Sequence, residues 1–68
     1  MNIAPWPDFK GDEIPEGCTI AHPSGQQGKV IFRPERDLPE DQWLVDYGLG
    51  FESRLVLQIG ERGQAIRI

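Results

Sequence analysis

Hydrophobic and polar positions alternate most clearly along residues 42–59, QWLVDYGLGFESRLVLQI. In the first half of this run, Trp43 and Val45 share one face while their neighbours point the other way. A period of two is typical of a β-strand rather than a helix. After a glycine-containing break at residues 48–50, the alternation resumes over residues 53–59. The run therefore predicts a β-hairpin that supplies much of a small core. Its second half is predicted to place three side chains inward, those of Leu55, Leu57 and Ile59.

Three shorter segments show the same strand-like alternation, at residues 18–22, 29–33 and 64–68. The loop at 23–28 contains proline and two glycines, which favour a turn because proline fixes φ and glycine permits positive φ. Residues 60–63, GERG, are predicted to be a four-residue hairpin loop before the last strand. The side chains available to the core from these segments are those of Cys18, Ile20, Val30, Phe32, Ala65, Ile66 and Ile68.

Two linking segments lack a strand pattern. Residues 37–40, DLPE, have the spacing of a capping box with a proline near a helix start, which predicts one helical turn. Residues 1–17 contain three prolines and are predicted to form an extended or irregular arm. Trp6 or Phe9 of this arm is expected to cover an open end of the core. The predicted organisation is therefore an arm at 1–17 followed by a barrel at 18–68.

Five short strands with closely spaced turns and no long helix predict an all-β chain. Short strands leave edges that must be hidden, and closing the sheet hides them. The smallest common closed arrangement is a five-stranded SH3-like barrel, which is the predicted fold. An OB-fold fits less well, because it needs longer strands and usually a helix.

The length of 68 residues limits the chain to one small core. With one cysteine and one histidine, the chain can form neither an internal disulfide nor a structural zinc site alone. Domains of this size often gain stability by association. Val56 is predicted to face outward from its strand, and residues 65–68 end the chain as a bare apolar edge. These features predict a homodimer or higher homo-oligomer. The competing prediction is a monomer, because the net negative charge of the acidic loops opposes association.

The formal net charge of −4 argues against non-specific binding to nucleic acid or to an anionic membrane. No run approaches the roughly 20 apolar residues that a membrane span requires. The first residues lack the basic and apolar regions of a signal peptide. A cytoplasmic location is therefore expected. Six of the eleven acidic residues lie in residues 35–54, beside a basic segment at 18–34. This distribution fits either a polarised binding face or ordinary mixing of surface charge, and ordinary mixing is favoured.

Aromatic residues around the central hairpin are the best candidates for a binding site. Tyr47 and Phe51 flank the glycine turn and are expected to be exposed, whereas the strand spacing of Trp43 favours the core. Exposed aromatics between loops bind extended peptides or cations. The leading prediction is therefore a non-enzymatic interaction module that binds a protein segment through the loops at 34–41 and 47–51.

The alternative of nucleic-acid binding would depend on the basic side chains, and net acidity counts against it. The residues that would carry it are Lys29, Arg33, Arg54 and Arg67.

No catalytic, cofactor or metal site is predicted. His22 and Ser24 are neighbours, and Asp46 could complete a triad, but adjacent loop positions seldom give the required geometry. His22 is expected to close a strand end and Ser24 to cap a turn. Cys18, on an apolar face, is expected to be a small core residue. The sequence contains no phosphate-binding glycine motif and no metal-ligand spacing, so no cofactor is expected.

Two local resemblances support the barrel. Residues 17–30, GCTIAHPSGQQGKV, resemble the first hairpin of KOW, Tudor-like and other SH3-like modules, and 43–47, WLVDY, resemble their aromatic third strand. Residues 57–60, LQIG, are similar to the Val-Gln-Ile-Tyr of the plasmid-borne type II dihydrofolate reductases, which are tetramers of SH3-like barrels around a pore. This second resemblance implies a homo-oligomeric pore-type enzyme as a further alternative.

The reductase resemblance covers only some of the family's pore positions. It implies that Gln58 and Ile59 would line the pore. Gly60 stands where the family has tyrosine, and His22 stands where the family has its cofactor-binding lysine. The resemblance therefore supports a shared architecture more than a shared activity.

Overall fold

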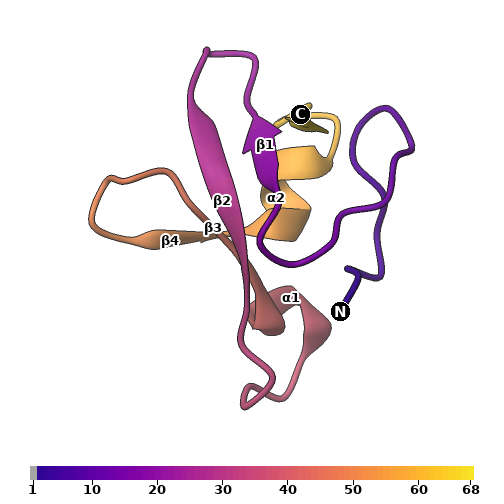
Figure 1. The fold of residues 1–68 in the computed structure, drawn as a ribbon, viewed down its shortest axis with the longest axis vertical. Coiled ribbons are helices and arrows are strands. Elements are labelled where there is room, and N and C mark those ends of the chain that lie inside the picture. The colour runs from indigo at the N-terminus through magenta and orange to yellow at the C-terminus, as the bar shows by residue number, and fades with distance from the viewer. Residues whose placement is uncertain (1) are drawn as a thin grey trace.

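The computed structural model describes residues 2–68, which form one antiparallel sheet with two short helices (Figure 1). The elements in chain order are β1 (Thr19–Ala21), β2 (Gln27–Phe32), α1 (Pro39–Gln42), β3 (Trp43–Asp46), β4 (Glu52–Arg54), α2 (Leu55–Ile59) and β5 (Ile66–Arg67).

The sheet has five strands in the order β4-β3-β2-β1-β5, and each neighbouring pair is antiparallel. The prediction of a small, mostly β chain is confirmed. The predicted closed barrel is not formed, because β4 and β5 lie at opposite edges and do not pair with each other. Neither helix in residues 2–68 is long and apolar enough to cross a membrane.

One face of the sheet carries the core. Val30 lies opposite Val45, and Phe32 lies opposite Trp43, so these four side chains project to the same side. Trp43 is only 3% exposed, and its ring centroid lies 4.6 Å from that of Phe32. The prediction that Trp43 belongs to the core is confirmed. The core cluster comprises Ala4, Ile14, Ile20, Val30, Trp43, Val45, Leu55, Ile59 and Ala65.

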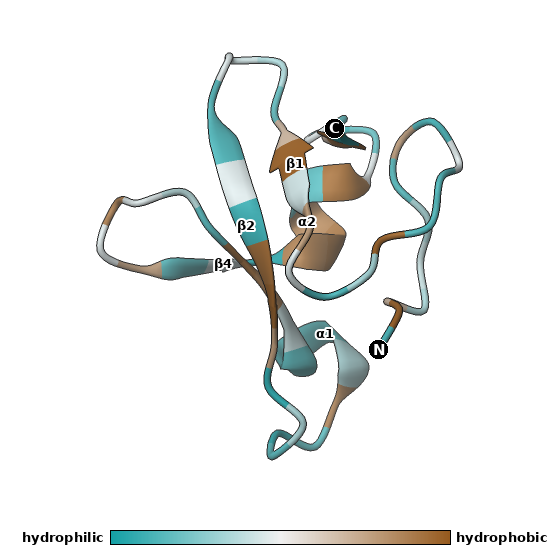
Figure 2. Ribbon diagram, viewed as in Figure 1, coloured by the Kyte–Doolittle hydropathy of each residue, from teal (hydrophilic) through white to brown (hydrophobic). Residues whose placement is uncertain are grey.

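The segment Leu55–Ile59 is the helix α2, so the predicted strand over residues 53–59 is wrong beyond Arg54. Residues four apart share a face in a helix as well as in a strand, and Leu55 and Ile59 are both buried. Leu57 distinguishes the two conformations, because a strand would bury it with Leu55 and Ile59, whereas in the helix it is 64% exposed. Val56 accordingly lies on a helix and not on an edge strand. Much of the ribbon of α2 is hydrophobic (Figure 2).

Residues 60–63 follow a helix, so they do not form the predicted hairpin loop between two strands. The backbone N–H of Gln64 donates to the carbonyl of Gly60 (2.7 Å), and that of Ala65 donates to the carbonyl of Gln58 (2.8 Å). These bonds end the helix and turn the chain toward β5. Ala65 is buried as predicted, whereas Ile66 is half-buried and Ile68 is exposed, so the last strand contributes less to the core than predicted.

Replacing Gly63 with alanine should destabilise the fold, because this turn packs backbone against backbone. A Cβ at Gly63 would lie 2.2 Å from the carbonyl oxygen of Gln58. Relieving such a clash by shifting the backbone costs about 1–3 kcal/mol. Urea denaturation should show a lower midpoint for Gly63→Ala than for Gly60→Ala, where the nearest atom to a Cβ is 3.6 Å away. Equal midpoints for the two variants would contradict this account of the turn.

The helix α1 begins with the predicted proline but lacks the predicted capping box. Its N-cap is Leu38, which makes no side-chain capping bond. The helix is instead a single turn whose shape follows from Pro39, since proline at the first position is preset for helical φ. Its end leads directly into β3.

The N-terminal arm is irregular, as predicted, and it contributes to the core. The N–H of Ala4 donates to the carbonyl of Ile14 (2.8 Å), and both side chains are buried in the core cluster. Of the two aromatics expected to cover the core, Trp6 packs against it, while Phe9 is 47% exposed.

Candidate functional site

A row of charged side chains crosses the outer face of the sheet. Lys29 lies directly opposite Asp46, and Asp46 lies directly opposite Glu52 on the next strand. Residues directly opposite each other project to the same side of a sheet, and Val45, next to Asp46, points to the core. The row therefore lies on the face away from the core, with two carboxylates side by side.

Two ion pairs connect this face to Arg33, which directly follows β2, and to Asp41 in α1. The guanidinium of Arg33 donates from Nε to Oε1 of Glu52 (2.9 Å) and from Nη2 to Oε2. These bonds lower the pKa of Glu52 and raise that of Arg33. The Nη2 of Arg54 lies 2.8 Å from Oδ1 of Asp41. Because these pairs are accessible to water, their main effect is to position the side chains rather than to stabilise the fold.

An apolar centre lies beneath these ion pairs. Leu44 is 4% exposed, although it lies outside the core cluster. In the register it is opposite Ile31 on one side and Arg54 on the other. Because the stem of an arginine covers apolar surface while its guanidinium stays in water, Arg54 is suited to shield Leu44.

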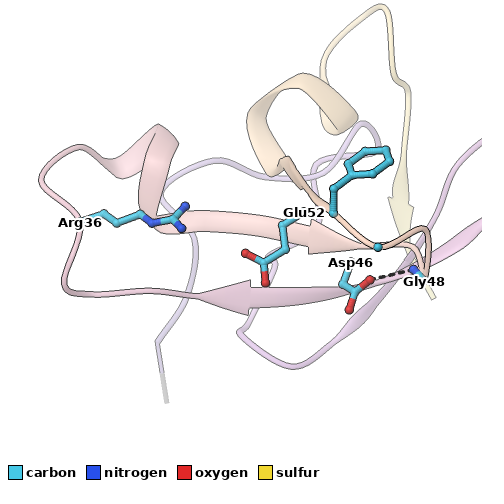
Figure 3. Close-up of a pocket in the computed structure, with 6 residues that line it drawn as sticks. Arg36, Asp46, Gly48 and Glu52 are labelled. Atoms are coloured by element: carbon cyan, nitrogen blue, oxygen red, sulfur yellow. Dashed lines mark hydrogen bonds between the residues drawn. The ribbon is translucent and has the colours of Figure 1, made fainter.

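The outer face is hollowed between the loop at 33–38 and the loop at 47–51. This hollow has a volume of about 640 Å³ and is lined by Arg36, Asp46, Gly48, Gly50, Phe51 and Glu52. Figure 3 shows Arg36 reaching in from one loop, with Asp46 and Glu52 side by side on the strands. A second hollow of about 660 Å³ shares Arg36 and is lined by Glu35, Asp37, Leu38 and Asp41.

The turn at one end of the hollow is ordered by a carboxylate and two glycines. The N–H of Gly48 donates to Oδ1 of Asp46 (2.7 Å), as Figure 3 shows. Gly48 and Gly50 have φ values of 80° and 89°, which side-chain-bearing residues rarely adopt. The turn presents Phe51 with 60% of its surface exposed. An exposed aromatic residue and two carboxylate residues thus contribute to the lining of the same hollow.

The structure separates the three aromatic residues predicted to bind a partner. Phe51 lines the hollow, while Trp43 is in the core. Tyr47 is half-buried rather than exposed on the surface. A Cβ on Gly28 would lie 2.8 Å from the Tyr47 ring, so the glycine makes room for it. The Tyr47 hydroxyl donates to Oε1 of Gln58 (2.9 Å), which links β3 to α2, and burial raises the pKa of Tyr47.

The basic residues predicted for nucleic-acid binding are mostly next to acids. Arg33 and Arg54 are engaged in ion pairs on the outer face. Arg67 lies on β5, at the far edge of the sheet, and donates from Nη1 to the carbonyl of Glu13 (3.1 Å). Lys29 lies next to the acidic row. Three of the four cations therefore share the outer face with the acids, and only Arg67 lies apart from them.

His22 and Ser24 form a local turn. The N–H of Ser24 donates to Nδ1 of His22 (3.1 Å), and Ser24 Oγ lies 2.9 Å from the same nitrogen. The carbonyl of His22 accepts from Gly25, so the pair orders the β1–β2 loop, as the turn prediction expects. Asp46 accepts instead from Gly48 at another turn. Within residues 2–68, no group of three acidic, histidine or cysteine side chains could hold a metal ion.

The positions that resemble the reductase pore have structural partners within the chain. Gln58 accepts from Tyr47, and Ile59 is 6% exposed in the core. A buried isoleucine cannot line a pore, so only part of the implied lining is accessible. Comparison with known proteins yields no match among family models, curated proteins or solved structures.

The sequence identified Phe51 individually as a binding residue of this hollow, but none of the other lining residues. Arg36, Gly48 and Gly50 lie within the loops that were predicted to bind, and Asp46 was considered only as a possible triad member. Glu52 was not considered. The concentration of acids in residues 35–54 pointed to the region, but not to the pairing of Asp46 with Glu52. That pairing depends on the register of β3 and β4, which the sequence does not reveal.

Proposed function

We propose that this chain is a non-enzymatic interaction module that binds an extended protein segment carrying basic and apolar side chains. The observation that supports this proposal is the hollow between the loops at 33–38 and 47–51, whose lining includes exposed Phe51 together with Asp46 and Glu52. An aromatic residue offers stacking and cation–π contacts, and the carboxylate of Asp46 in the same hollow favours a cationic side chain.

The charge around the hollow favours a basic partner. Asp41 and Glu52 are neutralised by arginines. The cations that remain near the hollow are Arg36 in its lining and Lys29 opposite Asp46. The other acids close to the two hollows in sequence or in space are Glu35, Asp37, Glu40 and Asp46. Complementary charge steers association and excludes acidic partners more than it raises affinity. Exposed Leu38 and Phe51 supply apolar contact area in the two hollows.

We infer that the sheet is an open variant of the SH3-like arrangement. A hairpin with a glycine-containing turn, a longer loop, a second hairpin and a short last strand follow one another in that order, which supports this inference. Pairing of Arg33 and Arg54 with acids favours a protein segment over nucleic acid, and burial of Ile59 counts against a reductase-like pore.

Selection from a random peptide display library tests the proposal. Peptides enriched on the protein should contain lysine or arginine together with apolar residues, and their binding should weaken as salt is added. In ¹⁵N spectra they should shift the amides of residues 33–38 and 46–52. Enrichment of acidic peptides, or shifts confined to other segments, would contradict the proposal. Stronger binding of a single-stranded oligonucleotide than of the peptides, with a steep salt dependence, would favour the nucleic-acid alternative.

Replacing Phe51 with alanine should weaken peptide binding by roughly tenfold or more, since aromatic anchors dominate such interfaces. The thermal midpoint should stay near that of the wild type, because the ring is mostly exposed. Phe9→Ala is the matched control, since Phe9 is similarly exposed but lies in the arm. Isothermal titration calorimetry with a selected peptide measures both variants, and an equal loss in the two would place the binding site elsewhere.

A further inference from the structure

Asp8 is a buried charge in the irregular N-terminal arm. Asp8 is only 4% exposed, and its carboxylate accepts three backbone hydrogen bonds. Oδ1 accepts from the N–H groups of Lys10 (2.9 Å) and Asp12 (2.8 Å), which fold the arm into a loop. Oδ2 accepts from the N–H of Arg67 (2.7 Å), at the opposite end of the chain. One carboxylate therefore both shapes the arm and fastens it to β5.

The loop that Asp8 shapes, residues 5–13, has independently fixed ends. Ala4 and Ile14 are buried in the core and joined by a backbone hydrogen bond. Beyond them, Ile3 and Pro15 form a bridge, and the N–H of Glu16 donates to the carbonyl of Asn2 (2.9 Å). Loop 5–13 can therefore lift away while its base remains in place, although lifting it also removes Trp6 from its contact with the core. Figure 1 shows this loop next to the C-terminal part of the chain.

Loop 5–13 covers the outer edge of β5, which the sheet order leaves without a neighbouring strand. On the inner side, β5 pairs with β1, and the N–H of Ile68 donates to the carbonyl of Thr19. On the outer side, the carbonyl of Ala65 accepts from the N–H of Phe9 (3.1 Å), and the N–H of Arg67 donates to Asp8. The loop thus satisfies the edge groups that another strand would otherwise bind.

The uncovered edge would be complementary to itself. Ala65 offers one acceptor and Arg67 one donor, on either side of Ile66. In an antiparallel arrangement with a twofold axis at Ile66, each donor meets the acceptor of the other copy. A second copy of the chain would therefore supply the donor for Ala65 and the acceptor for Arg67 that loop 5–13 supplies in the closed form.

We propose that loop 5–13 is a latch on the edge of β5, that loss of the Asp8 charge opens it, and that the opened edge pairs with β5 of a second copy. The three groups that hydrogen-bond to the Asp8 carboxylate are all N–H donors. A protonated carboxyl or an asparagine amide would place a donor of its own against at least one of these N–H groups, and that hydrogen bond would be lost. The covered edge also means that the closed form lacks the bare terminal edge predicted from the sequence. Self-association is therefore coupled to opening of the latch.

The pH dependence follows from the groups around Asp8. Burial by itself raises the pKa of Asp8, but the amides of Arg67, Asp12 and Lys10 together hold it below 3.8. The charged side chain of Arg67 faces the same region, as does the thiol of Cys18, whose pKa burial raises. The stabilisation from Asp8 is complete above about pH 3.8, its ordinary value, and is lost as the pH falls through the folded pKa.

Asp8→Asn in the full chain removes this charge at neutral pH, and Asp12→Asn is the matched control in the same loop, since Asp12 is exposed. Hydrogen exchange at pH 7 should show the amides of Phe9 and Arg67 exchanging roughly tenfold faster, or more, in Asp8→Asn. The amide of Val30, which donates within the sheet to Cys18, should keep its protection. Sedimentation equilibrium should show a dimer for Asp8→Asn at concentrations where Asp12→Asn is monomeric.

Three results would overturn the proposal. Wild-type protection of Arg67 in Asp8→Asn would show that the carboxylate does not hold the latch. Fast exchange of Arg67 in a protein that remains monomeric would show that the opened edge does not pair with a copy. Loss of protection at Val30 together with Arg67 would show that loop 5–13 does not open independently of the core. In the wild type, the Arg67 amide shift should move with the Asp8 titration below pH 3.8.

Discussion

Trp43→Ala is expected to lower the free energy of unfolding by about 3–5 kcal/mol, the usual cost of truncating a buried tryptophan. Trp43 is 3% exposed and packs against Phe32, with their ring planes inclined at 35°. Removing the indole leaves a cavity that the short strands around it cannot close without breaking their ladder. A domain of this size has only a few kcal/mol of stability in total, so the variant should be largely unfolded.

Thermal and urea denaturation followed by circular dichroism measure this effect. Phe51→Ala is the control, because it also removes an aromatic side chain but from an exposed position. An unchanged thermal midpoint for Trp43→Ala would show that the indole is not a core anchor. A similar loss in both variants would show that aromatic content, rather than burial, governs the stability.

Leu55→Ala is expected to cost about 2–5 kcal/mol, whereas Leu57→Ala should change the stability by less than about 0.5 kcal/mol. Leu55 has no exposed surface, and Leu57 is 64% exposed, because they lie on different faces of α2. In a strand, residues two apart share a face, and the two substitutions would have similar effects. The pair of variants therefore tests the conformation of this segment in solution.

Urea denaturation of the two leucine variants gives the comparison directly. Alanine favours a helix, so the substitutions do not weaken α2 through propensity, and the difference between them reports burial. A loss for Leu57→Ala as large as that for Leu55→Ala would restore the strand predicted from the alternation.

The strands of the central hairpin could be predicted where alternation and β-propensity agreed. In β3, Trp43 and Val45 face the core, as the period of two predicts. The same reasoning failed at Leu55–Ile59, since the i and i+4 positions coincide in a strand and in a helix. There the deciding factor was tertiary, because the helix buries Leu55 and Ile59 against the sheet and leaves Leu57 in water.

The candidate site was predictable as a region but not as an arrangement. The acids of residues 35–54 and the glycines around residue 49 indicated exposed loops, and Phe51 was identified from its place next to the turn. The grouping of Asp46 with Glu52 depends on the β3–β4 register, and Tyr47 left the surface because Gly28 makes room for its ring. Such contacts join positions far apart in sequence, and local patterns carry no information about them.

By itself, the sequence determined a small, mostly β chain with an irregular N-terminal arm, a tryptophan in its core and an acidic pair of loops, because alternation, proline content and charge are local properties. Only the tertiary structure decided that the sheet stays open and that α2 replaces a strand. It also decided how the edge of β5 is covered. Asp8 reaches Arg67 across 59 positions, and that contact exists only after the sheet has brought the two ends of the chain together.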